Sequence, residues 1–145
     1  MTKPAYWNEA TAALSRRDPV LRRLIRRYPD IHLRQRSDAF TTLARAIVGQ
    51  QISVRAADAI WGRFVALVSQ APPVPFPSLS PPSVASADLN ALRRCGLSQR
   101  KAEYLTDLAA HFVSGRLDPK HWASLDDEAL IAALVDVKGI GRWTA

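Results

Sequence analysis

The last eleven residues, VDVKGIGRWTA, contain the spacing in this chain that is best suited to bind a phosphate. Gly139 and Gly141 interrupt a helix-like run, and glycine accepts a positive φ without strain and lets another backbone come close. If a second helix begins at Gly141 or Arg142, its first-turn N–H groups are unpaired and can donate to phosphate oxygens. Lys138 and Arg142 would add positive charge on the two sides of this turn.

The pattern of an amphipathic helix, then glycine, an apolar residue and glycine, then the start of another helix predicts a helix-hairpin-helix element. Glycine pairs between helices are also common as simple C-caps, so these letters alone leave that alternative open. The predicted DNA-binding hairpin consists of Lys138, Gly139, Ile140, Gly141, Arg142 and Thr144.

The distribution of charge favours a polyanionic partner. The chain has 20 Lys+Arg and 13 Asp+Glu, a formal net charge of +7. Residues 1–55 hold eleven basic and four acidic side chains, whereas residues 56–145 hold nine of each, so the surplus lies in the first third. Sixteen of the basic residues are arginine, whose guanidinium matches phosphate geometry. Many basic proteins nevertheless never bind nucleic acid.

Part of this charge lies on a predicted helix in DPVLRRLIRRYPD, with Asp18 as N-cap and Pro29 as its stop. Its apolar side chains recur at helical spacing: Leu21, Leu24, Ile25 and Tyr28. Its arginines form two i,i+4 rows on the opposite side: Arg22 with Arg26, and Arg23 with Arg27. These rows are either a solvated face or a contact to the DNA backbone, and the sequence leaves both open.

Helical periodicity continues in the rest of the chain, and no alternating strand pattern of useful length occurs. Helices are expected to end near Gly49 and Gly96, and others are expected to begin after the caps Ser53 and Ser98. Another begins at Ser124, with Asp127 three residues later as an approximate capping box. The prediction is an all-α fold.

Residues 71–82 form a proline-rich connector that contains six of the ten prolines and is expected to be neither helix nor central strand. Because each flank is too short for a core of its own, residues 1–145 are predicted to form one domain. No membrane-spanning run or secretory signal is present, so a cytoplasmic location is expected. The single cysteine, Cys95, excludes an internal disulfide and is expected to be a core filler.

Four segments together resemble a known family: ARAIVGQQISVRAADAIWGRF, LRRCGLSQRKAEYLTDLA, LDDEALIAALVDVKGIG and LVDVKGIGRWTA. In order and spacing they resemble the helix-hairpin-helix DNA glycosylases, in particular DNA-3-methyladenine glycosylase II, over about residues 38–145. The resemblance implies a helical glycosylase domain that flips alkylated purines out of duplex DNA and hydrolyses their N-glycosidic bond in base excision repair. It implies double-stranded DNA with alkylated bases as partner, no cofactor and a monomer. Whether an ion binds the hairpin stays open.

The resemblance also suggests roles for residues outside the glycines. The tight turn GQQIS matches the family's wedge, so Gln51, with Gln50 beside it, would fill the gap left by the flipped base. The alternative is a glutamine that caps the turn. Lyase-competent relatives carry a lysine where this chain has Trp143, so the resemblance implies a monofunctional enzyme with Trp143 at the pocket. Trp143 could instead pack against the hairpin.

In this family the catalytic aspartate follows the hairpin, beyond Ala145, so no catalytic residue is expected within the chain. Asp127 and Asp136 do not occupy the matching position. The resemblance therefore implies a C-terminally incomplete glycosylase domain that is inactive as it stands. The alternatives are a noncatalytic helix-hairpin-helix DNA-binding module and a helical domain whose arginines face a protein partner.

Overall fold

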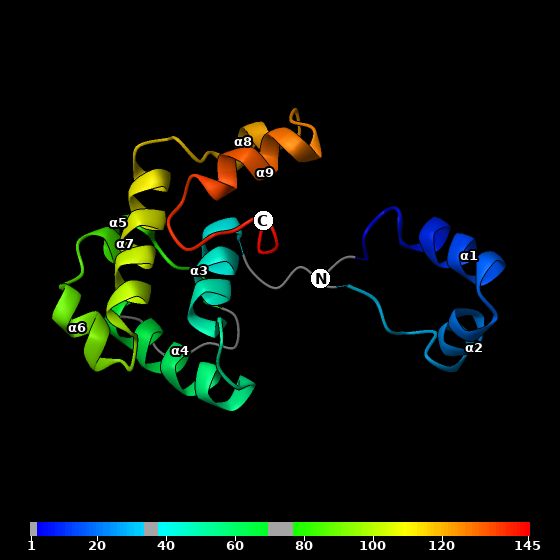
Figure 1. Ribbon diagram of the computed structural model, residues 1–145, viewed down its shortest axis with the longest axis horizontal. Helices are drawn as coiled ribbons and strands as arrows, with labels where there is room; N and C mark the ends of the chain where they lie inside the picture. Colours follow the sequence, from blue (N-terminus) through cyan, green and yellow to red (C-terminus); the bar gives the residue numbers. More distant parts are fainter. Residues whose placement is uncertain (1–2, 34–37, 70–76) are drawn as a thin grey trace. The chain divides into compact units, whose positions relative to one another are not determined.

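The computed structural model describes residues 3–33, 38–69 and 77–145 (Figure 1). These residues form two compact units, an N-terminal unit within Met1–Arg36 and a C-terminal unit within Ser37–Ala145. Every regular element in the described ranges is a helix, which confirms the all-α prediction. None of these helices is long and apolar enough to cross a membrane. The assignment of residues 1–145 to a single domain stays a prediction.

The N-terminal unit consists of two helices, α1 (Trp7–Arg17) and α2 (Pro19–Arg27), that pack against each other. Asp18 begins α2 as predicted, since its carboxylate accepts the amides of Val20 and Leu21 at 2.6 and 3.0 Å. Pro29 lies just beyond the helix end, where the sequence placed its stop.

The C-terminal unit is built around α7, which packs against α3, α5 and α6 (Figure 1). The bounds of its helices are α3 Ala39–Gly49, α4 Val54–Ser69, α5 Pro81–Ala85, α6 Leu89–Arg94, α7 Gln99–Val113, α8 Pro119–Trp122 and α9 Asp127–Val135. Its core contains the fully buried side chains Ile47, Phe64, Leu92, Leu105 and Leu108. Cys95 belongs to this core, and burial raises the pKa of its thiol, which fits a filler rather than a nucleophile.

The start of α3 is fixed by a polar cluster. The Asp38 carboxylate accepts the Thr41 amide at 2.9 Å and the hydroxyls of Thr41 and Ser78 at 2.8 Å. Burial raises the pKa of Asp38, but these hydrogen bonds outweigh burial and leave the pKa below its ordinary value. The Thr41 hydroxyl in turn accepts the Leu79 amide at 2.9 Å, which ties α3 to the segment before α5.

Most of the predicted caps are confirmed, and one is wrong. Ser53 and Ser98 accept first-turn amides of α4 and α7, and Gly96 ends α6 with φ +100°. At α9 the cap is Asp126, whose carboxylate accepts the Ala129 amide at 2.8 Å. Ser124 instead donates to the His121 carbonyl at 2.7 Å and closes the turn after α8. Ser124 and Asp126 are both suitable N-cap residues, and Asp126, whose carboxylate is the stronger hydrogen-bond acceptor, caps α9.

The proline-rich connector lies partly outside the described residues, because positions 71–76 are not among them. Residues 77–80 carry no regular structure, as predicted. The last part of the prediction is wrong, since α5 begins at Pro81 and continues through Pro82. Proline is accepted in a first helical turn because the missing N–H has no intrahelical partner there.

Candidate nucleic-acid interface

The two glycines of the hairpin have different structural roles. Gly139 has φ +82°, and a Cβ there would lie 2.1 Å from Cδ2 of Tyr104, so only glycine fits both the conformation and the space. Gly141 is not in the left-handed region, and a Cβ there would meet nothing within 4 Å. Gly139 therefore makes the turn, while Gly141 leaves open space beside the exposed backbone. Between them Ile140, 4% exposed, anchors the hairpin in the core.

The hairpin presents three consecutive free amides. Within the described residues, the N–H groups of Gly141, Arg142 and Trp143 donate no hydrogen bond, and all three residues are exposed. The amides of Thr144 and Ala145 both donate to the Gly141 carbonyl, at 2.8 and 3.1 Å, which is the hydrogen bonding of a first helical turn. Residues 142–144 form a turn and not a complete helix, and the bare N–H groups of such a turn can donate to an anion.

The two cationic side chains beside the hairpin, Lys138 and Arg142, differ in their ion pairing. The ammonium of Lys138 has no carboxylate within ion-pair distance in the described ranges. Arg142 donates from Nη2 to both oxygens of Glu128 on α9, at 2.5 and 2.7 Å. This pair is mostly exposed and is worth little in water, so Arg142 can exchange Glu128 for a phosphate at small cost.

The second predicted DNA-contact segment is the glutamine turn, residues 50–53 between α3 and α4. Lys101 on α7 holds it, because its Nζ donates to the carbonyls of Val48 and Gln50, each at 2.8 Å. Burial lowers the pKa of Lys101. Gln50 donates from Nε2 to the Gly139 carbonyl at 2.8 Å and thereby joins the turn to the hairpin. Gln51 has φ 58°, is exposed, and its side chain forms no hydrogen bond in the described part of the chain.

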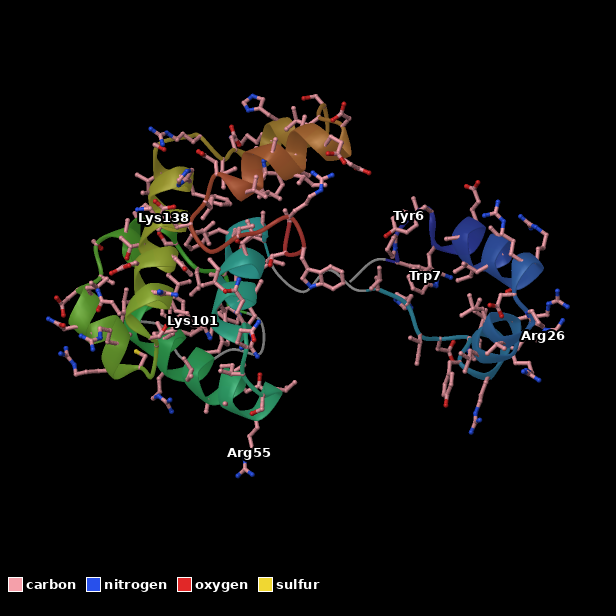
Figure 2. All side chains as sticks on the ribbon, viewed as in Figure 1. Tyr6, Trp7, Arg26, Arg55, Lys101 and Lys138 are labelled. Atoms are coloured by element: carbon pink, nitrogen blue, oxygen red, sulfur yellow. The ribbon has the colours of Figure 1, made fainter. Side chains whose placement is uncertain are left out.

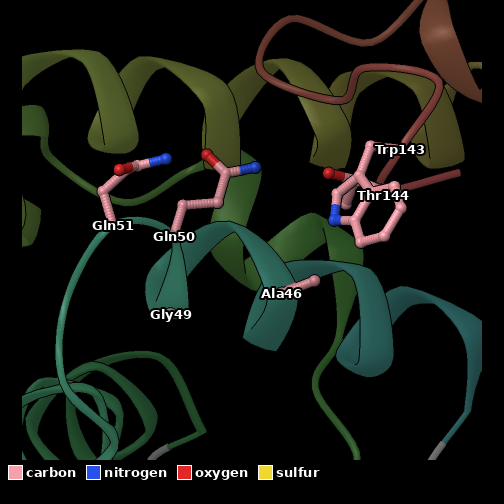
Figure 3. Close-up of a pocket in the computed structure, with 6 residues that line it drawn as sticks. All are labelled: Ala46, Gly49, Gln50, Gln51, Trp143 and Thr144. Atoms are coloured by element: carbon pink, nitrogen blue, oxygen red, sulfur yellow. The ribbon is translucent and has the colours of Figure 1, made fainter.

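An open hollow lies between the glutamine turn and the hairpin (Figure 3). Its volume is about 500 Å³, within the range of ligand pockets, roughly 300–1,000 Å³. Its lining consists of Ala46, Gly49, Gln50, Gln51, Trp143 and Thr144. Trp143 is 100% exposed, so the alternative that it packs against the hairpin is wrong. Such an exposed indole beside a hollow is the arrangement of a stacking partner.

No catalytic carboxylate lines this hollow. Asp136 lies in the turn after α9 and accepts a hydrogen bond from His111, while Asp127 lies in the first turn of α9. The described residues contain no group of three or more His, Cys, Asp or Glu side chains that could hold a metal ion.

The arginine rows of α2 are exposed, and Figure 2 labels Arg26 among them. None of the four has a carboxylate partner among the described residues, although Arg22 donates from Nε to the Ser15 carbonyl at 2.7 Å. Their guanidinium groups are therefore accessible to solvent and to phosphate alike.

Sequence reasoning missed the residues of α7 that hold the two loops. Lys101, Tyr104 and Asp107 lie beside the apolar stripe of α7 and look like ordinary surface positions. Their partners are 31 to 53 residues away along the chain, so no local spacing signals these contacts.

Comparison with known proteins agrees with this geometry. Residues 44–143 match the family described as "HhH-GPD superfamily base excision DNA repair protein". The chain is 34% identical over 123 residues to DNA-3-methyladenine glycosylase 1 of Schizosaccharomyces pombe, covering 84% of this chain and 52% of that protein. It is 40% identical over 114 residues to the DNA-3-methyladenine glycosylase of Saccharomyces cerevisiae, covering 74% of this chain and 37% of that protein.

A solved structure gives the same assignment. The 3-methyladenine DNA glycosylase of Schizosaccharomyces pombe in complex with abasic DNA superposes with a TM-score of 0.74 at 32% identity. The match covers 94% of this chain and 66% of that one. The chain thus spans about half the length, or less, of the two curated relatives. With a family match over most of its length and a glycine hairpin of free amides, the chain belongs to the HhH-GPD superfamily of base excision DNA repair proteins.

Proposed function

We propose that this chain is the part of a DNA-3-methyladenine glycosylase that binds DNA and recognises the damaged base, in an enzyme that excises alkylated purines from duplex DNA. The observation that carries the proposal is the row of three free amides at Gly141, Arg142 and Trp143, next to a hollow of nucleobase scale. The amides would hold the phosphate backbone, and the hollow would receive the flipped base. The names of the relatives support the alkylated-base class.

The chemistry of an alkylated purine suits this site. Alkylation gives the base a positive charge and makes it a good leaving group, so the enzyme mainly needs a pocket that binds a cationic ring. The exposed Trp143 indole offers a π face for such a ring. An indole has no amine to form a Schiff base, so the proposed reaction is hydrolysis without strand cleavage. The carboxylate of the family reaction would come from outside these residues.

Gln51 is proposed as the side chain that fills the gap left by the flipped base. Its left-handed backbone and its side chain without a partner distinguish it from Gln50, whose amide is engaged by Gly139. We expect Gln51→Gly to bind intact duplex normally and to unfold at an unchanged or higher temperature, because glycine removes the backbone strain. Its preference for abasic over intact duplex should fall by about fivefold, roughly one net hydrogen bond. An unchanged preference in parallel titrations would argue against the wedge.

The arginine rows of α2 provide a separate test of the charge distribution. If they contact the DNA backbone, Arg23→Gln, Arg26→Gln and Arg27→Gln combined should lower the slope of log affinity against log salt by about 2–3. Arg116→Gln, an exposed arginine after α7, serves as the single-charge control. An unchanged slope would identify the α2 rows as a solvated face.

The proposed activity is tested by joining this chain at Ala145 to the segment of the Schizosaccharomyces pombe relative that follows the matching position. The chimera is expected to release 3-methyladenine from methylated duplex DNA, and the chain alone is expected to bind duplex without release. A chimera that folds and binds duplex but releases no base, while the relative does, would contradict the proposal. That result would favour a noncatalytic DNA-binding module.

A further inference from the structure

One side of α7 contacts both DNA-contact loops. Lys101, Tyr104, Asp107 and His111 follow each other along the helix, three, three and four residues apart. Lys101 holds the glutamine turn, and the Tyr104 ring lies against Gly139. Asp107 contacts Lys138, the first residue of the hairpin, and His111 contacts Asp136, two residues before it.

Asp107 fixes the backbone of the hairpin directly. Its Oδ2 accepts the Lys138 amide at 2.9 Å, across 31 residues of sequence. This bond occupies the amide just before Gly139, whereas the amides of Gly141, Arg142 and Trp143 donate no hydrogen bond among the described residues. The Asp107 side chain is 22% exposed, although its hydrogen bond with the Lys138 amide lies at the surface.

His111 contacts Asp136, which lies two positions before Lys138 in the chain. The ring is 7% exposed, with Nδ1 2.9 Å from the Asp107 carbonyl and Nε2 3.2 Å from Oδ2 of Asp136. Nδ1 faces the Asp107 carbonyl and Nε2 faces the Asp136 carboxylate, so the ring links α7 to the turn after α9. The carboxylates of Asp107 and Asp136 are the charged groups within ion-pair distance of the ring in the described residues.

We propose that Asp107 and His111 are positioning residues for DNA binding, which hold the hairpin on α7 so that its free amides meet the phosphate backbone. The contact of His111 with Asp136 would hold the turn that leads into the hairpin. This inference rests on the proposed function, because it assumes that the hairpin binds DNA.

Positioning and simple electrostatics predict opposite signs for Asp107. Removing a carboxylate near a polyanion tightens binding when only charge matters. Removing a carboxylate that holds the hairpin weakens binding, because a flexible hairpin loses conformational entropy when its free amides bind DNA. The direction of the change therefore distinguishes the two explanations.

The experiment measures the affinity of the whole chain for a fluorescent duplex with a central abasic site, at fixed salt. Asp107→Ala is expected to bind about tenfold more weakly, and Asp107→Asn, whose amide oxygen still accepts the Lys138 amide, to stay within about threefold of the unmodified chain. Glu103→Ala removes an exposed carboxylate of the same helix and should bind as tightly or more tightly. Circular dichroism checks that each variant is folded.

The second arm uses His111→Ala, which removes the contact to Asp136, at the same fixed salt and pH. His111→Ala should bind the duplex about fivefold more weakly than the unmodified chain, roughly the loss of one net hydrogen bond. His121→Ala, at an exposed histidine paired with Asp118, should bind as tightly as the unmodified chain. This arm and Asp107→Asn decide the question if Asp107→Ala does not fold.

Two results would overturn this inference alone, provided that the unmodified chain binds duplex. The first is equal or tighter binding by Asp107→Ala, and the second is equal binding by His111→Ala and the unmodified chain. No duplex binding by the unmodified chain overturns the proposed function and this inference with it.

Discussion

Gly139→Ala is expected to weaken duplex binding by about 10- to 100-fold, because the hairpin cannot keep its shape with a side chain at this position. The residue has φ +82°, and the new Cβ would lie 2.1 Å from Cδ2 and 2.5 Å from Cγ of the Tyr104 ring. The left-handed backbone and the clash together cost about 2–4 kcal/mol. The hairpin would have to leave α7, and its amides would no longer form one row. Anisotropy titration with labelled duplex measures the effect.

Gly141→Ala is the matched control for the fold. A Cβ at Gly141 meets nothing within 4 Å, so this variant should unfold at the temperature of the unmodified chain. Its methyl group would occupy space beside the free amides, so duplex binding should still fall by a few fold, or roughly 1 kcal/mol. Binding by Gly139→Ala at the unmodified affinity would contradict the role given to this turn.

Lys101→Met is expected to destabilise the chain and loosen the glutamine turn. Methionine has a similar length but no donor, so the carbonyls of Val48 and Gln50 lose a bond of 2.8 Å each. The loss should cost about 1–3 kcal/mol and lower the Tm by about 4–12 °C. The preference for abasic duplex should fall with it, since Gln51 depends on the turn for its strained conformation.

Lys120→Met, at an exposed position in α8, is the control for loss of a positive charge and should leave the Tm nearly unchanged. Thermal unfolding followed by circular dichroism measures both variants. Equal melting temperatures for Lys101→Met and the unmodified chain would show that Lys101 does not support the turn.

Helices and most caps could be predicted because their signals are local. A cap such as Asp18 or Ser98 bonds an amide at most three residues away. The buried apolar side chains of α7 recur at the spacing of one helix face, so their burial can be predicted from the sequence. The same locality explains the error at α9, where Ser124 and Asp126 both satisfy the rule and only the folded turn after α8 selects one.

The site could be predicted only in part. The spacing of Gly139 and Gly141 indicated a hairpin, but the different roles of the two glycines depend on Tyr104, which lies on another helix. Likewise, the sequence does not show which hairpin amides are free, because the acceptor of the Lys138 amide is Asp107 on α7. Such contacts follow from the packing of α7 against distant loops, and no short pattern in the sequence encodes them.

The most direct test of the account follows the backbone amides of the hairpin by ¹⁵N nuclear magnetic resonance during titration with an abasic duplex. The account predicts that the signals of Gly141, Arg142 and Trp143 shift strongly on binding, while that of Ile140, whose amide donates to the Val137 carbonyl at 3.1 Å, shifts little. Duplex binding that leaves the three free amides unchanged, with shifts confined to α2, would contradict it.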